Sequence, residues 1–469
     1  MAIFVTSPVL IATCAVLALW LLHKVWLWFD YRLALKRNGC GEPPRYPHKD
    51  PIFGLDLFMQ YMNGFKSGDF LDTNKRHYET YGKTFKANLF GTTFIKTIDP
   101  EVSKSFHSTS FNKFGLQPLR YEVSKNLFGN GIIVVDGPHW QHGRALIRSS
   151  FDIVHIANFE QLGRHVRHFL DLLPRDGSTI DLLPLFKRLI LDTTSEFIFG
   201  ESMNALSSPE SSKDFMDAFA YAQRGTGIRA MLGRFKFLHR DKEWWKACKT
   251  VTDFADRHVE KAIARVEKGE VAGKDSNYLR LVDEMAKDTQ DRLTLRSHIL
   301  SVFSPAHDGA AIALSNITFT DCFSLAHRIT PIATMNQRQC LESTVLPLGG
   351  GKAGQSPLYI QKGNIVEVNY RCMQLSKELW GGGAEEFRPE RWQDIRPTWE
   401  YTPFGGGPRI CPGLRLVYTE SGYVTVMLLR EFESLENRDP ELQWKEEMRL
   451  TAQSKNGTLV GLVPENKSL

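Results

Sequence analysis

The sequence predicts a mainly α-helical globular domain with small β-sheets, preceded by a single N-terminal transmembrane helix. Helical periodicity dominates residues 101–315, and short runs with β character lie on both sides of this region. The uncharged apolar run at residues 2–22 has the length of a membrane span. With 42% hydrophobic and 24% charged residues and no low-complexity tract, the chain of 469 residues is typical of a folded protein.

The apolar run is interpreted as a membrane anchor, with a cleaved signal peptide as the weaker alternative. It has no basic segment before it, it is long, and it shows no small-residue cleavage site. Positive charge follows the run at Lys24, Arg32, Lys36 and Arg37, which predicts that the bulk of the protein faces the cytosol.

Three segments are expected along the chain. Residues 1–23 form the anchor, residues 24–51 form a basic and then proline-rich hinge, and residues 52–469 form one globular domain. Within that domain, β-type runs at residues 83–90 and 93–98 predict a small sheet.

Long amphipathic helices are expected around residues 140–170, 179–199, 242–268 and 291–315. Short β-like runs return between residues 345 and 368, and the triple glycine at 349–351 is interpreted as a turn rather than a phosphate-binding loop.

Charge and cysteine usage exclude several classes of function. A net charge of +5, spread over 58 basic and 53 acidic residues without a basic run interleaved with aromatics, predicts no nucleic-acid partner. The seven cysteines are odd in number and scattered, without a CxxC pair, which favours a reduced, cytosol-facing domain.

The segment most informative about chemistry is residues 404–413, FGGGPRICPG, followed by an amphipathic run. A glycine-rich loop lets the backbone approach a flat cofactor closely, and the helix that follows directs its positive amino end at the sulfur of Cys411. This setting favours a thiolate, which is the proximal ligand that a haem iron needs to cleave bound oxygen. Arg409 would neutralise a haem propionate, whereas an isolated cysteine would more often be an inert buried thiol.

The same segment resembles the haem-binding signature of the cytochrome P-450 superfamily, F-x-x-G-x-R-x-C-x-G, at every fixed position: Phe404, Gly407, Arg409, Cys411 and Gly413. The resemblance implies haem b with its iron bound by Cys411, oxygen activation with electrons from NADPH through a cytochrome reductase, and a triangular α-rich fold. Because the anchor fits such an enzyme, we expect a single-pass protein of the endoplasmic reticulum membrane.

Two further segments follow the order of that superfamily. Trp140 and Arg144 resemble its W-x-x-x-R motif, and residues 387–392, FRPERW, look like its meander motif before the cysteine loop. The resemblance implies that Trp140 and Arg144 contact a haem propionate and that Arg338 is a further propionate-binding arginine.

The central helix departs from the superfamily's pattern. That pattern ends in an acid followed by a threonine, which relay protons to bound oxygen, and here the matching residues are Asp308 and Gly309. Asp308 and Gly309 are the catalytic candidates, and a water molecule held by Asp308 would have to replace the missing hydroxyl.

A second departure concerns the E-x-x-R pair that normally precedes Arg338. No such pair occurs at residues 316–337, and the interval is several dozen residues shorter than usual. Residues 385–388, EEFR, fit the spacing only by coincidence because they overlap the meander. We expect the domain to be truncated here, through a gene-model error, a splice variant or a decayed gene.

Residues 41–58 and 345–363 resemble fungal enzymes that hydroxylate n-alkanes and fatty acids. A monooxygenase acting on a lipophilic substrate, such as a fatty acid, an alkane or a secondary-metabolite intermediate, is therefore the leading hypothesis. The main alternative is a catalytically silent relative that lacks the E-x-x-R segment. A secreted cysteine hydrolase is a weak third hypothesis, because no supporting motif surrounds any of the 14 histidines.

Overall fold

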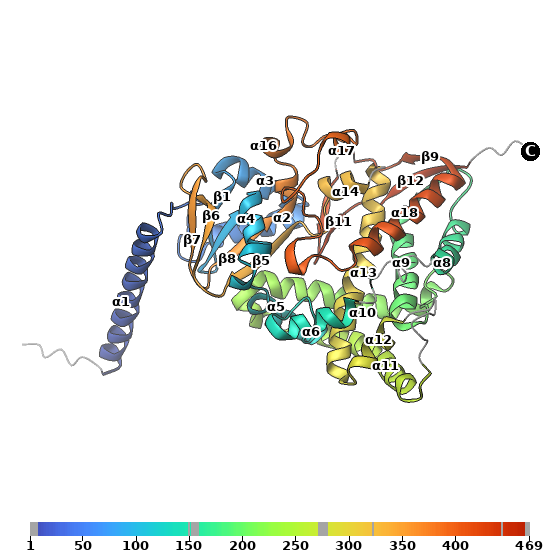
Figure 1. The fold of residues 1–469 in the computed structure, drawn as a ribbon, viewed down its shortest axis with the longest axis horizontal. Helices are drawn as coiled ribbons and strands as arrows, with labels where there is room; N and C mark the ends of the chain where they lie inside the picture. Colours follow the sequence, from blue (N-terminus) through green and yellow to red (C-terminus); the bar gives the residue numbers. More distant parts are fainter. Residues whose placement is uncertain are drawn as a thin grey trace, which may run out of the picture.

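The computed structural model describes residues 8–148, 151, 159–270, 280–320, 323–441 and 444–464. Helix α1 (Pro8–Arg37) stands away from the rest of the molecule (Figure 1). Over Ile11–Arg37 it is long and apolar enough to cross a membrane, in agreement with the single span predicted from the sequence. The helix continues without a break to Arg37, so the boundary expected at residue 23 does not coincide with its end.

The C-terminal end of α1 is fixed to the globular part. Tyr31 and Leu35 are buried, and the ring of Tyr31 lies 5.9 Å from that of Tyr359. Beyond the helix, the backbone N–H of Gly41 donates to the carbonyl of Pro357 at 3.0 Å. The proline-rich segment after Arg37 is thus attached to the globule along its path.

The largest sheet has five strands in the order β1-β2-β8-β5-β3. Only β2 and β8 run parallel, and the other neighbours are antiparallel. This sheet confirms the β runs predicted at residues 83–98 and adds strands from the second β region. Its strands are β1 (Thr84–Leu89), β2 (Thr92–Thr97), β8 (Ile365–Asn369), β5 (Met335–Cys340) and β3 (Phe114–Gly115).

Three smaller sheets complete the β structure: the hairpin β6 (Thr344–Gly350) with β7 (Ser356–Ile360), the sheet β4 (Thr179–Asp181), β12 (Leu459–Pro464) and β9 (Phe432–Asn437), and the hairpin β10 (Glu446–Met448) with β11 (Ala452–Ser454). The triple glycine lies at the turn of the first hairpin, as predicted. Gly349 and Gly351 have φ of 96° and 74°, the region that favours glycine.

Helices form the remainder of the described structure. They are α2 (Leu55–Ser67), α3 (Phe70–Tyr81), α4 (Pro100–Lys104), α5 (Gln117–Phe128), α6 (Gly137–Arg148), α8 (Phe159–Asp171), α9 (Leu182–Phe199), α10 (Pro209–Leu232), α11 (Lys242–Glu267), α12 (Leu281–Asp288), α13 (Arg292–Thr320), α14 (Phe323–Ile329), α15 (Tyr370–Gln374), α16 (Lys377–Trp380), α17 (Arg391–Asp394) and α18 (Leu414–Glu431). Short helical turns are η1 (Ser105–Thr109), η2 (Phe111–Lys113), η4 (Gly233–Leu238) and η5 (Gly407–Arg409). The four long helical regions predicted from periodicity are confirmed in their described parts with one exception: residues 179–181 form strand β4, and helix α9 begins only at Leu182.

Helix α13 passes through the middle of the globular part, between α18 and α14 on one side and α10 and α11 on the other (Figure 1). Its apolar residues contribute to three hydrophobic clusters, which include Phe303, Leu314 and Ile317. A helix that is apolar all round is typically buried, and α13 carries neighbours on nearly every face.

Candidate active site

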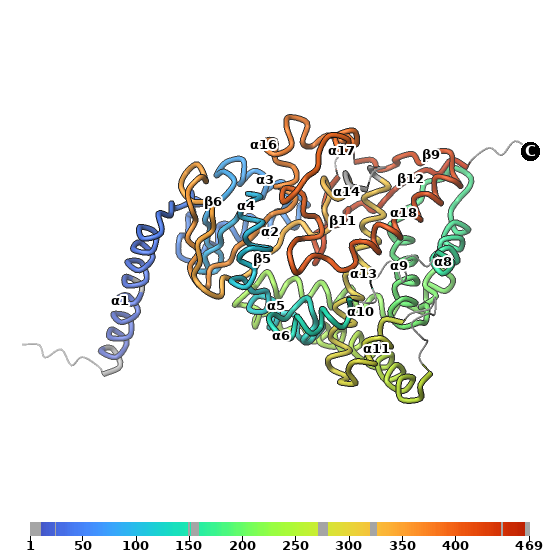
Figure 2. Tube along the Cα trace, in the orientation of Figure 1, coloured from blue at the N-terminus to red at the C-terminus, as the bar shows by residue number. Residues whose placement is uncertain are grey.

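The cysteine loop leads directly into α18, which begins at Leu414 (Figure 2). The N–H of Cys411 donates to the carbonyl of Phe404 at 3.1 Å, which closes the loop. Gly407 has a φ of 63°, and a Cβ there would lie 2.0 Å from the carbonyl oxygen of His107, so only glycine fits. Backbone packing, rather than side chains, therefore holds the sulfur in place.

The surroundings of Cys411 act on its charge in two directions. Burial raises the pKa of the thiol, while the backbone N–H groups of Gly413 and Leu414 and the charge of Arg144 act to lower it. Leu414 begins α18, so the sulfur lies at the positive end of this helix, as the sequence predicted. A bound cation at the sulfur would complete the stabilisation of a thiolate.

Three of the predicted propionate-binding residues converge beside this loop. Arg409 donates to the carbonyls of Ile132 and Val135 at 3.1 and 2.7 Å, and to the carboxylate of Asp136 at 2.7 Å. Its guanidinium lies 4.5 Å from the centre of the Trp140 ring. Arg144 donates to the carbonyl of Ile410 at 2.9 Å, one residue before the cysteine.

Arg338 reaches the same region from β5. It donates to the carbonyl of Phe106 at 2.9 Å and to Nδ1 of His107 at 3.3 Å, while its Nε is buried without a partner. His107 in turn bonds to the Tyr370 hydroxyl at 2.9 Å. The unpartnered Nε is a donor for which the described residues provide no acceptor.

Arg120 on α5 belongs to this cluster and was missed in the sequence, because no motif distinguishes it. It donates to the carbonyl of Ile133 at 2.8 Å. Charge interactions link it to Arg409 and Arg338, and Asp136 is the carboxylate that acts on all three. An excess of guanidinium groups over carboxylates indicates an anionic ligand.

One face of α13 differs from the rest of the helix. Pro305 is exposed and Ala306 is half-buried, although the residues around them are buried. A Cβ at Gly309, one turn further along, would meet no atom within 4 Å. These three residues lie on one side of the helix and leave an uncovered apolar surface.

Asp308 lies off this face, and side chains from other parts of the chain contact its carboxylate. The hydroxyl of Thr451 donates to its carboxylate at 2.8 Å, and the ammonium of Lys187 lies 3.7 Å away. His307 is a core residue stacked on Phe303. Thr451 was not found in the sequence, because 143 residues separate it from Asp308.

These residues fit a haem. Cys411 offers a sulfur at a helix amino end. Four guanidinium groups, three of which share the carboxylate of Asp136, fit two propionates, and the apolar face of α13 fits a flat ring. Pro305, Ala306 and Gly309 would bring only small or apolar groups to that ring.

The cytochrome P450 family model matches residues 44–319 and 326–460, which is most of the globular domain. The chain belongs to the cytochrome P450 family. The signature around Cys411 and the order of α6, α13, β5 and α18 agree with this assignment, and the haem iron follows from it.

Curated P450 relatives cover nearly the whole chain. A cytochrome P450 monooxygenase of Emericella nidulans, apdE, is 32% identical over 93% of this chain and 92% of its own length. The monooxygenase iccC of Talaromyces variabilis is 33% identical over 91% of this chain and 93% of its own length. The monooxygenase fsdH of Fusarium heterosporum is 31% identical over 98% of this chain and 89% of its own length. By family, this P450 is therefore a monooxygenase of a kind found in fungi.

The region of the missing E-x-x-R pair contains one member of that pair. Arg328 of α14 is fully buried beside the meander, where it donates to the carbonyls of Gln374 and Ala384. Leu325 occupies the position of the glutamate, three residues earlier. Glu385, in the coincidental match, pairs with Lys75 at the surface.

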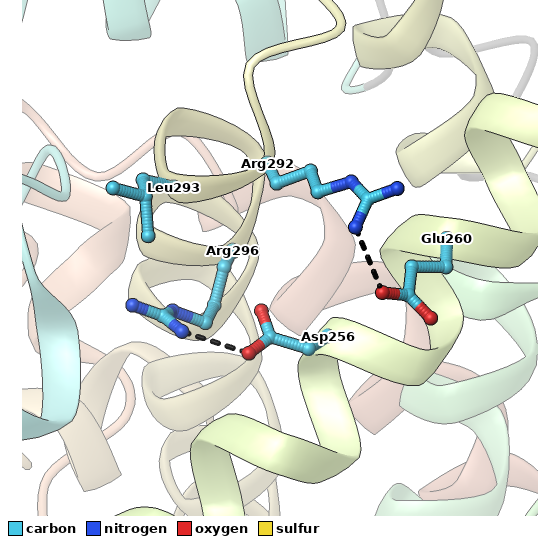
Figure 3. Close-up of a pocket in the computed structure, with 5 residues that line it drawn as sticks. All are labelled: Asp256, Glu260, Arg292, Leu293 and Arg296. Atoms are coloured by element: carbon cyan, nitrogen blue, oxygen red, sulfur yellow. Dashed lines mark hydrogen bonds and ion pairs between the residues drawn. The ribbon is translucent and has the colours of Figure 1, made fainter.

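A separate pocket lies between α11 and α13 and contains no catalytic candidate (Figure 3). Its two guanidinium groups are neutralised: Arg292 pairs with Glu260 at 3.1 Å and Arg296 with Asp256 at 2.8 Å. This pocket therefore offers no free charge to a ligand.

The buried carboxyl of Glu420 on α18 should make the free energy of unfolding depend on pH. Burial raises its pKa to about 7, while a hydrogen bond from Thr193 opposes the shift. The unfolded chain loses this proton near pH 4.5, so the free energy of unfolding falls as pH rises from about 4.5 to 7. We expect Glu420→Gln to be more stable than the wild type by about 2–3 kcal/mol at pH 8 and equal to it at pH 4.5.

Urea unfolding at both pH values measures this difference, with exposed Glu433→Gln as the control. An equal gain at both pH values would show that the charge of Glu420 is not responsible.

Proposed function

We propose that this P450 inserts one oxygen atom of dioxygen into a lipophilic small molecule, with electrons from NADPH delivered by a cytochrome reductase. The observation that carries the proposal is the position of Cys411 at the amino end of α18, beside the four guanidinium groups. We further propose that α1 crosses the endoplasmic reticulum membrane once, with the catalytic domain in the cytosol.

Each part of the site has a role in this reaction. When bound, the haem supplies oxygen activation, which the electron donation of a thiolate ligand promotes. Cys411 would be that ligand and Gly413 would leave room beside it. Arg409, Arg338 and Arg144 would hold the propionates, with the indole of Trp140 packed against Arg409.

Proton supply in this P450 must differ from the common pattern. Asp308 holds a hydrogen bond from Thr451, so a hydroxyl from the β10–β11 hairpin lies where it can pass a proton to the carboxylate. Lys187 connects the same carboxylate to Gln453 at 2.8 Å, on the same hairpin. We propose that Thr451 takes part of the role of the threonine that Gly309 replaces.

A lipophilic substrate is supported by two features. The uncovered face of α13 at Pro305 and Ala306 carries no polar side chain, and a membrane anchor places the enzyme beside a bilayer into which such a substrate partitions. Within this class, an alkane, a fatty acid and a secondary-metabolite intermediate are all compatible with the site.

One observation favours a catalytically silent relative as the second candidate. The alignment with apdE is 478 positions long, but it contains 93% of this chain, which is about 436 residues. About 42 aligned positions of apdE therefore have no counterpart in this chain. The family match is interrupted at residues 320–325, where we infer the shortening to lie. The side chains of residues 319–325 lie outside the described part of the structure.

The carbon monoxide difference spectrum of the full chain, expressed in eukaryotic microsomes and reduced with dithionite, separates the two candidates. A strongly red-shifted Soret band shows that haem is bound through a thiolate, and NADPH consumption with fatty acids or alkanes then tests the substrate class. Absence of the band with folded protein present would favour the silent relative.

Gly309 offers a test of the proposed proton route. A Cβ has open space there, and threonine and valine are two branched residues that differ by a hydroxyl in place of a methyl group. We expect Gly309→Thr to raise the ratio of product formed to NADPH consumed, and Gly309→Val to leave it unchanged or lower. Equal ratios in the two variants would mean that a hydroxyl at residue 309 has no role in proton delivery.

A further inference from the structure

Two guanidinium groups lie near each other beside the meander without a carboxylate. Arg328 donates from its Nη atoms to the carbonyls of Gln374 at 2.8 Å, Ala384 at 2.5 Å and Glu386 at 3.4 Å. Its Nε is buried and has no partner. Glu386 accepts this hydrogen bond through its backbone carbonyl, and its side chain is exposed.

Arg391 of α17 binds the same stretch of backbone. It donates to the carbonyls of Trp380 at 2.5 Å and Gly383 at 2.7 Å, and its Nε too is buried without a partner. Burial lowers the pKa of Arg328 to about 10, and the positive charge of Arg391 adds to this effect. Among the described residues, neither guanidinium forms an ion pair with a carboxylate.

Two indole N–H groups in the same part of the chain also lack an acceptor. The indole N–H groups of Trp380 and Trp392 are buried without an acceptor, and their rings lie 6.1 Å apart. The Arg328 guanidinium lies 5.1 Å from the Trp380 ring. Unsatisfied buried donors are uncommon in folded proteins, and each costs free energy. Together with the two Nε atoms, this makes four buried donors without an acceptor.

We propose that this cluster of Arg328, Arg391, Trp380 and Trp392, here called the meander anion site, binds a small carboxylate anion of the size of formate or acetate. The anion would supply the carboxylate that the E-x-x-R spacing lacks at residue 325. A guanidinium group matches a carboxylate through two parallel hydrogen bonds. Arg391 is only partly buried, which leaves a route for a small ion to enter.

The energetic argument favours such a ligand. A buried charge without a counter-ion destabilises a fold strongly, and two like charges together do so more. A ligand that binds the folded chain only raises the free energy of unfolding by about 1.4 kcal/mol for each tenfold increase in concentration above its dissociation constant. The stability of the protein should therefore depend on the concentration of a small carboxylate.

Thermal unfolding of the purified full-length chain tests the proposal with sodium formate as the probe. Ionic strength is held constant with the sodium salt of a bulky sulfonate, which removes general screening as a cause. We expect the unfolding temperature to rise with the logarithm of formate concentration. An unfolding temperature independent of formate would overturn the proposal. Stability is the readout, so the result does not depend on the proposed oxygenation.

Two variants at one position locate the effect. Residue 325 lies one turn before Arg328 on α14, so Leu325→Glu places a carboxylate within the chain itself, whereas Leu325→Gln has nearly the same shape without charge. We expect Leu325→Glu to unfold at a higher temperature without formate and to lose the formate response, and Leu325→Gln to keep the response.

The arginines around Arg409 are a second cationic cluster to which formate could bind, and Leu325→Glu leaves that cluster unchanged. A full formate response in Leu325→Glu would thus assign the binding to another site and contradict the proposal. Should Leu325→Glu not fold, Arg391→Gln tests the same assignment. We expect this variant to bind formate with at least a tenfold weaker apparent affinity.

Discussion

A chain in which Cys411 is replaced by serine gives no red-shifted Soret band with carbon monoxide after reduction, while the protein still folds. A serine hydroxyl is not ionised at neutral pH and gives the iron no thiolate, so the spectroscopic signature of the sulfur ligand disappears completely. The difference spectrum of Cys411→Ser, recorded beside that of the wild type, measures this effect.

The loop geometry predicts that folding survives the change. The loop is closed by the N–H of Cys411 and by the packing of Gly407 against His107, and neither contact uses the sulfur. Cys248→Ala is the control, because Cys248 is a free cysteine that lies on α11 in a hydrophobic cluster, away from the cysteine loop. A persistent band in Cys411→Ser, or its loss in Cys248→Ala, would contradict the assignment of Cys411 as the ligand.

The residues that could be predicted from the sequence share a property. Cys411, Arg409 and Gly413 lie within ten consecutive residues, and Trp140 and Arg144 are four residues apart on one helix. Short-range spacing fixes their relation before the chain folds. The long helices could be predicted for the same reason, because their periodicity is local.

The residues that could not be predicted meet only through the tertiary fold. Thr451 reaches Asp308 from a hairpin far along the chain, and Arg120 joins Arg338 through packing of α5 against β5. Arg328 was overlooked because its usual signal is a glutamate three residues earlier, which this sequence lacks. Only its burial against the carbonyls of Gln374 and Ala384 shows where it belongs.

Removal of the Lys96 ammonium is expected to lower the free energy of unfolding by about 3–5 kcal/mol, since a buried charge is left without its partner. Lys96 on β2 and Glu367 on β8 are direct register partners in the five-stranded sheet and form an ion pair. Their side chains are 1% and 2% exposed. In Lys96→Met the carboxylate of Glu367 would keep only the hydrogen bond from Gln337, at 2.7 Å.

The double variant Lys96→Met/Glu367→Leu decides whether the charge or the packing is responsible. Replacing both members of a buried ion pair with apolar residues is often neutral, so we expect the double variant to recover most of the lost stability in guanidinium unfolding. A single variant within about 1 kcal/mol of the wild type would show that the pair does not hold the sheet. The outcome bears on the site, because Arg338 pairs with Val366, the residue before Glu367, and its position depends on the same strands.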